Sequence, residues 1–283
     1  MILDCTLRDG GYYTNWDWPY DFVVKYLEAM ESCDDVDILE LGFRGETGGK
    51  YADLSDEWIE TLEVPKSKRI AIMLNTARLR NVSDLSTHLA QAKDSPVDIV
   101  RLATHIEDLD RVGPYISRVK EMGYECWLNI MQATQYFPPP SIPRRWGRPD
   151  MIVLADSLGE SDAGEGEIWL SDIQFGYHPH NNLGQATGEA ERALNSWAAC
   201  VDSSVCGLGR GAGNARTELL VRDIPQSLVD LCADIEAMRP ELKWGPSPLY
   251  AYAARHGIHP TYVQNGAELD ELRELHGKRR YEP

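Results

Sequence analysis

Two histidines separated by a single residue, His178 and His180, could hold one metal ion together. They lie in the segment 175–181, which we interpret as a β-strand. Residues i and i+2 of a strand point to the same side, so both imidazoles can face one ion. A single histidine is commonly a satisfied core or surface residue, whereas this pair at a strand end indicates metal ligation. Imidazole suits zinc, iron and manganese, and an added carboxylate broadens the choice.

Arg8 and Asp9 form a second candidate site, in the run TLRDGG that ends the apolar segment 2–7. The carboxylate of Asp9 is a hard oxygen ligand, and the guanidinium of Arg8 is a partner for an oxyanion. The alternative is a surface ion pair at the turn that follows a strand.

A glycine-rich segment at 206–214, CGLGRGAGN, is the third candidate. Its spacing of Gly207, Gly209 and Ala212 matches the dinucleotide-binding fingerprint, but no strand–helix–strand unit follows it. We therefore favour a loop whose backbone approaches a ligand closely and which carries Asn214 as a further oxygen ligand. A tight turn between a strand and a helix remains the alternative.

The elements that must position these residues alternate between short apolar runs and amphipathic helical patterns. Such alternation predicts parallel strands, and eight of them predict a (β/α)8 TIM barrel, whose active site lies at the C-terminal strand ends. We assign residues 1–240 to the barrel and 241–283 to a C-terminal helical extension. Strands are predicted at 2–7, 36–43, 69–75, 98–104, 125–132, 151–156, 175–181 and 203–208. Helices are predicted at 83–92, 109–122, 183–200, 214–238 with an interruption at Pro225, 250–255 and 268–276. Two connections are unusual: 137–149 is rich in proline, and 157–173 is short and acidic.

Composition excludes several function classes. The 283 residues carry 28 Lys and Arg against 45 Asp and Glu, a net charge of −17. This balance argues against binding to nucleic acid or to an anionic membrane surface. No run of about 18 apolar residues and no signal peptide is present, so we expect a cytoplasmic protein. The six cysteines are scattered without a Cys-x-x-Cys pair, which favours reduced thiols over a cysteine metal site.

Taken together, the motifs carry a resemblance to a known family. The runs LRDG at 7–10, HPHNNLG at 178–184 and GLGRGAGN at 207–214 occur in the order and strand positions of the DRE-TIM metallolyases, also called HMGL-like. The sequence is most similar to the metal-dependent 4-hydroxy-2-oxovalerate aldolase branch. VRLATH at 100–105 and ADSLG at 155–159 resemble further strands of that branch, and the resemblance covers about residues 1–220.

The resemblance implies a metal centre and a reaction. Asp9, His178 and His180 would bind a divalent ion, Mn²⁺, Mg²⁺ or Zn²⁺, with Asn214 as a fourth or outer ligand. The reaction would cleave or form a 4-hydroxy-2-oxo acid through a metal-bound pyruvate enolate, so the partners would be a small 2-oxo acid and an aldehyde. Members of the family are often homo-oligomers. Docking to an acylating aldehyde dehydrogenase is in question because the C-terminal region is short.

The resemblance also implies catalytic roles. Arg8 would hold the enolate oxygen, Glu40 would orient Arg8, and Tyr250 would lie near the substrate. Tyr12 stands where the aldolases carry their acid/base histidine, so proton transfer falls to Tyr12, Tyr250, His105 or a metal-bound water.

Further expectations concern the rim of the pocket. Thr104 and His105 belong to the matched fourth strand and are substrate-binding candidates. Arg44, after the second strand, could bind an anionic substrate group or pair with Glu46 instead. The aromatic loop 12–18 either shapes the substrate end of the pocket or staples the first helix. The proline-rich segment 137–149 could be a lid or a protein contact.

Three other functions remain open. A Claisen-type acyl transferase or synthase of the same superfamily would use an acyl thioester. A non-catalytic barrel scaffold would account for the missing histidine. An NAD-binding enzyme rests on the glycine fingerprint alone.

Overall fold

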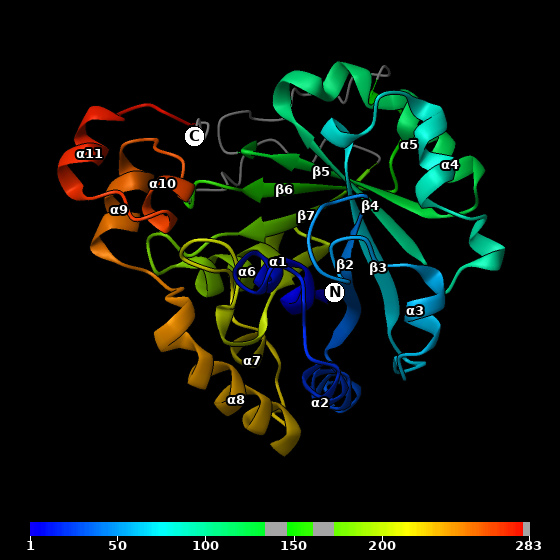
Figure 1. Cartoon of the computed structure of the whole chain (residues 1–283), viewed down its shortest axis with the longest axis horizontal. Coiled ribbons are helices and arrows are strands. Elements are labelled where there is room, and N and C mark those ends of the chain that lie inside the picture. The colour runs from blue at the N-terminus through cyan, green and yellow to red at the C-terminus, as the bar shows by residue number, and fades with distance from the viewer. Residues whose placement is uncertain (134–145, 161–172, 280–283) are drawn as a thin grey trace.

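The computed structural model describes residues 1–133, 146–160 and 173–279 and shows a closed barrel of eight parallel strands (Figure 1). Closure is direct, since β1 pairs with both β2 and β8. The TIM-barrel prediction is therefore confirmed. The strands are β1 Ile2–Asp4, β2 Val36–Arg44, β3 Arg69–Asn75, β4 Ile99–His105, β5 Glu125–Met131, β6 Met151–Asp156, β7 Gln174–Pro179 and β8 Cys200–Ser203.

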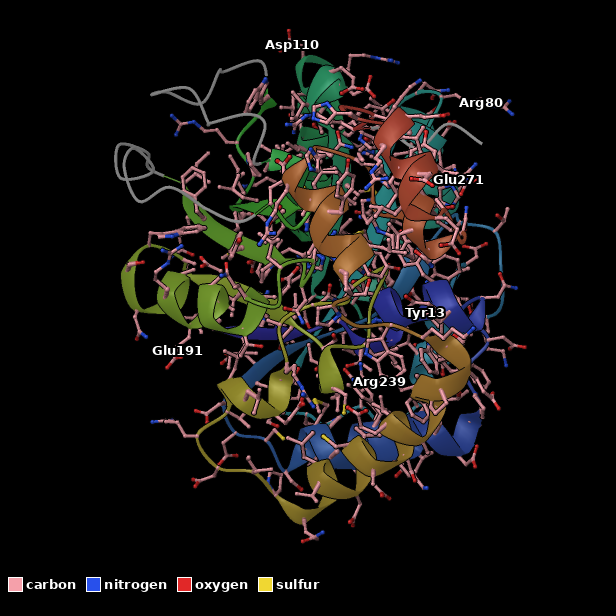
Figure 2. All side chains as sticks on the ribbon, turned by 90° about the vertical axis from the view of Figure 1, so that its left-hand side faces the viewer. Tyr13, Arg80, Asp110, Glu191, Arg239 and Glu271 are labelled. Atoms are coloured by element: carbon pink, nitrogen blue, oxygen red, sulfur yellow. The ribbon has the colours of Figure 1, made fainter. Side chains whose placement is uncertain are left out.

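Helices and 3-10 turns surround the barrel, and a group of short helices lies beyond the ends to which β6 and β7 point (Figure 1). Figure 2 turns this side toward the viewer and shows these C-terminal helices in front, with side chains drawn. The helices are α1 Thr6–Thr14, α2 Tyr20–Glu31, α3 Asp56–Glu60, α4 Leu85–His88, α5 Gly113–Glu121, α6 Ala186–Ser196, α7 Thr217–Leu220, α8 Gln226–Leu242, α9 Pro248–Arg255, α10 Thr261–Gln264 and α11 Leu269–Glu274. The 3-10 turns are η1 Thr76–Arg78, η2 Val82–Asp84, η3 Ala92–Asp94, η4 Ile106–Arg111 and η8 Val205–Gly207.

The first and last strands are shorter than predicted. β1 ends at Asp4, whose carboxylate accepts the backbone N–H of Thr6 at 2.9 Å, and α1 begins there. Arg8 and Asp9 thus lie on the first turns of a helix and not on a strand end. β8 occupies 200–203 and not 203–208, because the apolar residues after it form the buried turn η8. In both segments the residues after the strand are as buried as the strand itself, so the apolar pattern of the sequence does not reveal where the strand ends.

Most predicted helices are also shorter. The segment 83–92 contains only one helical turn, α4, because Leu89 is already extended. α5 begins at Gly113 with Pro114 in its first turn, as proline there favours. The segment 183–200 contributes α6, while its last residue starts β8, and 214–238 divides into α7 and α8 around Pro225.

The C-terminal helices form their own apolar cluster. Ala253, Ile258 and Leu272 are buried together, away from the main core. α9 starts two residues before the predicted 250–255, and α11 is shorter than 268–276. The division at residue 240 stays a prediction, and α8 runs past it to Leu242. Most of 137–149 and of 157–173 lies outside the described residues.

The barrel interior has an apolar floor and a charged layer above it. Trp127 belongs to an inner cluster of nine buried residues, Leu3, Cys5, Ile38, Ala71, Ile99, Trp127, Met151, Val153 and Cys200. Toward the C-terminal strand ends, Arg101 of β4 is fully buried between Glu40 of β2 and Asp202 of β8. The two ion pairs measure 3.0 and 2.5 Å. Charges this deep in a protein persist only when they are paired.

The sequence led to expectations about membrane spans and about the cysteines, and both can be examined in the described part of the chain. None of its helices has the length and apolar character that crossing a membrane requires. The six cysteines are all free thiols, and five of them are buried.

The charged layer yields a stability prediction. Arg101→Met leaves Glu40 and Asp202 as unpaired buried carboxylates, so we expect the free energy of unfolding to fall by about 3–5 kcal/mol. Urea denaturation followed by circular dichroism measures this loss. Arg222→Met is the matched control, because Arg222 pairs with Asp35 at the surface, where ion pairs contribute little to stability. Equal losses of stability in the two variants would contradict the view that Arg101 neutralises the buried carboxylates of Glu40 and Asp202.

Candidate metal centre and active site

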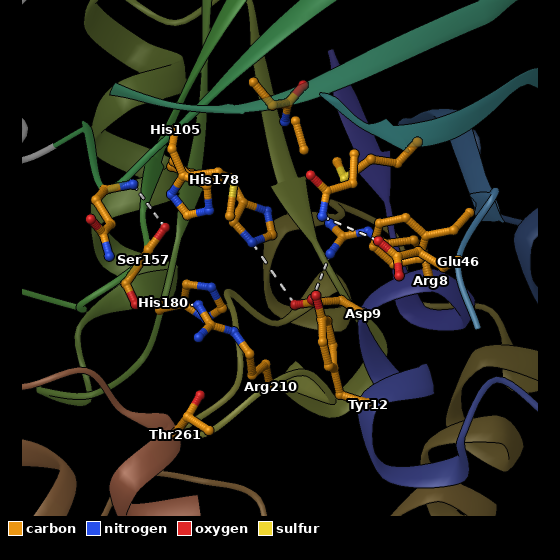
Figure 3. A pocket seen from close by; sticks show the side chains of 18 of the residues that line it. Arg8, Asp9, Tyr12, Glu46, His105, Ser157, His178, His180, Arg210 and Thr261 are labelled. Carbon is orange, nitrogen blue, oxygen red and sulfur yellow. Dashed lines mark hydrogen bonds and ion pairs between the residues drawn. The ribbon is translucent and has the colours of Figure 1, made fainter. Parts of the chain in front are cut away.

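Three side chains from distant parts of the sequence meet at the mouth of the barrel. Asp9 of α1, His178 of β7 and His180 just beyond it offer ligand atoms that all lie within 4.8 Å of one another. Their exposed fractions are 1%, 4% and 5%, so the group is closed off from bulk water. Figure 3 shows both imidazoles and the carboxylate converging on one space.

Hydrogen bonds fix how each imidazole is presented. The Nδ1 of His178 lies 2.9 Å from the Asp202 carboxylate, and the Nδ1 of His180 lies 3.2 Å from the carbonyl oxygen of Gly213. A carbonyl and an ionised carboxylate only accept, so both Nδ1 atoms carry a proton, and in the neutral form of each ring the Nε2 atom keeps its lone pair. Burial and the positive charge of Arg210 lower the pKa of His180 well below its usual value, which keeps that ring neutral.

Asp9 is held as a carboxylate. Its oxygens accept from Arg8 Nη1 at 2.6 Å and from the Asn214 amide at 2.5 Å. Burial alone would raise the pKa of Asp9, but Arg8, the two histidines and Asn214 hold that pKa well below its ordinary range. A deprotonated oxygen therefore faces the two imidazoles.

The site is part of a closed ring of charged side chains. Glu40 accepts from Arg8 Nε at 2.7 Å and also faces Arg101, which continues to Asp202 and so to His178. His178 Nε2 returns to Asp9 at 3.9 Å. The ring runs Asp9, Arg8, Glu40, Arg101, Asp202, His178. Three carboxylates and two guanidiniums sum to −3 + 2 = −1, so the ring carries an excess negative charge.

The donor set fits a divalent cation. Two neutral imidazole nitrogens and one carboxylate oxygen suit zinc, manganese or iron, and the negative ring favours an added cation. Asn214 adds a further oxygen, since its Oδ1 is buried and has no hydrogen-bond partner among the described residues. Asp202 and Gly213 hold the far side of each imidazole, as outer partners of metal-bound histidines do.

The glycine-rich loop packs directly on this group. A Cβ at Gly209 would lie 2.5 Å from the Asn214 amide nitrogen and 2.7 Å from the Asp9 carboxylate. Gly213 has φ +82°, and a Cβ there would lie 2.1 Å from the Gly207 carbonyl oxygen. The loop thus uses its glycines for close approach to the site, and α7 after it is only four residues long.

A cavity of about 270 Å³ opens from the metal-site residues toward the C-terminal helices. It has room for a small metabolite of a few carbon atoms. Its inner end is formed by Arg8 and the Asp9–histidine group, and its outer end includes His259 and Thr261, which follow α9 (Figure 3). The lining is Arg8, Asp9, Tyr12, Phe43, Glu46, Met73, Asn75, Ala103, His105, Asn129, Met131, Gln132, Ala155, Ser157, His178, His180, Arg210, His259 and Thr261.

Among the catalytic candidates, the structure brings Arg8, Tyr12 and His105 to the cavity. Glu40 lies beneath it and touches Arg8, in the position expected of an orienting carboxylate. Tyr250 is buried behind the glycine loop, where it contacts Tyr13, and does not line the cavity. The expectation that Tyr250 lies near the substrate stays a prediction.

Two substrate-binding candidates also lie elsewhere. Alternation along β4 turns Ala103 and His105 inward and Thr104 outward, where Thr104 bonds the Thr76 hydroxyl at 3.1 Å. Arg44 pairs with Asp56 and donates to the backbone carbonyl of His88, the last residue of α4, so it neither pairs with Glu46 nor lines the cavity.

Residues of the aromatic loop make two different kinds of contact. Tyr12 lines the cavity. Trp16 and Trp18 donate their indole N–H groups, each at 2.8 Å, to the backbone carbonyls of Arg8 and Leu7. These two bonds hold the first turns of α1, and with them Arg8, against the barrel.

Sequence analysis missed Asp202, Arg101, Arg210 and His259. Arg101 and Asp202 are isolated charges within apolar strand segments, a pattern that signals a buried partner but does not identify it. No signal along the chain links His259 to a cavity built by residues at the opposite end of the sequence.

A second group, Cys206, Glu218 and Cys232, also has ligand atoms within 4.8 Å of one another. Glu218 already accepts from the Cys206 N–H at 2.9 Å and from Arg216 at 2.6 Å. The adjacent Arg216 guanidinium opposes a second cation, and the expectation of no cysteine metal site stays a prediction.

Comparisons with known proteins place the chain in a family. A family profile described as HMGL-like matches residues 56–240, a range that holds both histidines and begins after Asp9. The chain is 30% identical over 244 residues to a protein named 4-hydroxy-2-oxovalerate aldolase from Burkholderia pseudomallei (strain K96243), covering 78% of this chain and 67% of the relative. It is 27% identical over 252 residues to a protein of the same name from Geobacillus genomosp. 3, covering 83% and 73%.

Solved structures agree on the fold. The N-terminal domain of a proposed aldolase from Bacteroides vulgatus superposes with a TM-score of 0.84 at 26% identity, over 97% of this chain and 99% of that chain. The carboxyl transferase domain of Rhizobium etli pyruvate carboxylase superposes with a TM-score of 0.64 at 14% identity, over 99% and 54%. The second likeness shows the barrel alone.

The geometry predicts specific effects on metal binding. Asp9→Asn and His178→Ala each remove a ligand and should abolish stoichiometric Mn²⁺ binding in equilibrium dialysis. Asp202→Asn removes only the outer partner of His178 and should weaken binding about 10- to 100-fold. Cys232→Ser is the control and should bind as the wild type does. Loss of binding in Cys232→Ser, with binding retained in His178→Ala, would move the site to the cysteine group.

Proposed function

The chain belongs to the HMGL-like family, and we propose that it is a divalent-metal-dependent aldolase that cleaves or forms a 4-hydroxy-2-oxo acid through a pyruvate enolate. One observation carries the proposal: a guanidinium, Arg8, stands beside the Asp9, His178 and His180 group at the inner end of a small cavity. Aldol cleavage next to a carbonyl leaves negative charge on the enolate oxygen. A metal ion and a guanidinium side by side can stabilise that charge.

Arg8 is prepared to receive that charge. Glu40 holds its Nε and Asp9 holds its Nη1, so the plane of the guanidinium is fixed. Its Nη2 has no hydrogen bond to a described residue and remains free to donate into the cavity. A donor fixed before the reaction stabilises developing charge without reorganising. A divalent ion held by Asp9, His178 and His180 would supply a Lewis acid for the 2-oxo and carboxylate oxygens of the substrate.

Proton transfer requires a base for the C4 hydroxyl and an acid for the enolate carbon. Tyr12 and His105 are the sequence candidates that line the cavity. They come from α1 and β4 and stand on different sides of the Asp9–histidine group (Figure 3). We propose that these two residues share the task that a histidine performs in the related aldolases.

Catalysis should depend on Arg8 and on a divalent ion. Arg8→Gln removes a fixed donor from the developing oxyanion and should lower kcat about 100- to 1000-fold in pyruvate-forming cleavage. A chelator should abolish turnover, and added Mn²⁺ should restore it. The matched control is Arg222→Gln, which keeps wild-type rates. Cleavage that persists at the wild-type rate in chelator would refute the aldolase proposal, and thiol release from an acyl-CoA would favour a Claisen-type synthase instead.

The proton-transfer candidates can be separated by pH. Histidine ordinarily titrates near pH 6.5 and tyrosine near pH 10. If His105 acts as the base, His105→Asn should remove one ionisation from the pH profile of kcat, while Tyr12→Phe keeps it. Exchange of pyruvate methyl protons, followed by NMR in D₂O, isolates the enolate step in both variants. Unchanged profiles and exchange rates in both would exclude these residues.

A further inference from the structure

Arg210 is a second guanidinium in the same cavity. It belongs to the glycine-rich loop and lines the outer part of the cavity. No carboxylate in the described chain pairs with it. Its two hydrogen-bond contacts, with His259 Nε2 at 3.3 Å and with the Ser157 carbonyl oxygen at 3.4 Å, are longer than well-formed N–H···O bonds. Arg8, by contrast, is neutralised by Asp9 and Glu40.

His259 presents a donor to the same place. Its Nδ1 accepts the backbone N–H of Thr261 at 3.3 Å. Burial and the Arg210 charge lower the pKa of His259 to about 3, so the ring is neutral. A neutral imidazole that accepts at Nδ1 carries its proton on Nε2. His259 Nε2 and Arg210 Nη1 lie 3.3 Å apart, so the imidazole and the guanidinium can both present an N–H group to one acceptor that lies beside them.

The surroundings select a negatively charged acceptor. Arg210 and His259 line the same cavity, and their nearest ring and guanidinium nitrogens lie 3.3 Å apart. Thr261 points its hydroxyl toward the same region (Figure 3). Charge-assisted hydrogen bonds from a guanidinium to carboxylate or phosphate oxygens are the strong ones.

We propose that the aldehyde partner of the reaction carries an anionic group, a carboxylate or a phosphate, at the end remote from its carbonyl, and that Arg210 and His259 bind this group. The inference rests on the proposed aldolase function. The 2-oxo acid already has a carboxylate site at Arg8 and the metal group, so the outer pair of donors is left for the second substrate. The 4-hydroxy-2-oxo acid would then be a dianion or a phosphorylated acid.

The test compares matched aldehydes in condensation with pyruvate. Glyceraldehyde 3-phosphate is set against glyceraldehyde, and succinic semialdehyde against butanal, and the ratio of kcat/KM within each pair is measured. We expect the wild type to prefer at least one anionic aldehyde by about 10- to 100-fold, the range that one or two charge-assisted hydrogen bonds supply. The pair that shows the preference identifies phosphate or carboxylate as the group.

Arg210→Met should reduce that ratio toward 1, and Arg210→Lys should retain part of it. Because the ratio is taken within one variant, a general loss of activity cancels. Arg222→Met changes the net charge equally at a surface ion pair and should leave the ratio as in the wild type. His259→Phe keeps a ring of similar size and should lower the ratio less than Arg210→Met does.

The two proposals fail in different ways. A wild type that condenses neutral aldehydes with pyruvate but shows no preference for anionic ones overturns the anionic-aldehyde inference and leaves the aldolase standing. An unchanged ratio in Arg210→Met also overturns the inference. A wild type that exchanges no pyruvate methyl protons and condenses no aldehyde overturns both.

Discussion

The closed ring of charges at the barrel mouth is the constraint on which the rest of the site depends. Each buried charge in it is stable only because its neighbours neutralise it, since an unpaired ion in a protein interior costs several kcal/mol. The members come from α1, β2, β4, β7 and β8, so the ring forms only when the barrel is closed. Fold and site are therefore specified together.

The ring also explains why its surplus charge faces the substrate. Glu40 and Asp202 are each shared with Arg101 below, whereas Asp9 reaches upward to the histidines. The excess of one negative charge thus lies where two Nε2 lone pairs converge, which is the arrangement that holds a divalent cation. Arg8 stands at the edge of the same group, so cation and guanidinium are set side by side by one network.

Much of this arrangement could be predicted from the sequence, for physical reasons. The period-2 placement of His178 and His180 and the alternation of apolar runs with helices are local patterns, and both indicate geometry directly. Asp202 was missed because its importance depends on contacts with β4 and β7 that no local pattern encodes. Thr104 belongs to a strand that reaches the pocket, but side-chain alternation along that strand turns it outward. Tyr250 was suggested by a short sequence match, and this segment lies behind the glycine loop.

The cavity has an inner end formed by the ring of charges and an outer end formed near the C-terminal helices. The central claim is that Asp9, His178 and His180 at the inner end hold a divalent cation. Crystals soaked in Mn²⁺ and measured at the manganese absorption edge test that claim most directly. The account predicts one anomalous peak bounded by Asp9 and by the Nε2 atoms of His178 and His180. A fully soaked crystal with no peak there, or with its peak beside Cys206 and Cys232, would contradict it.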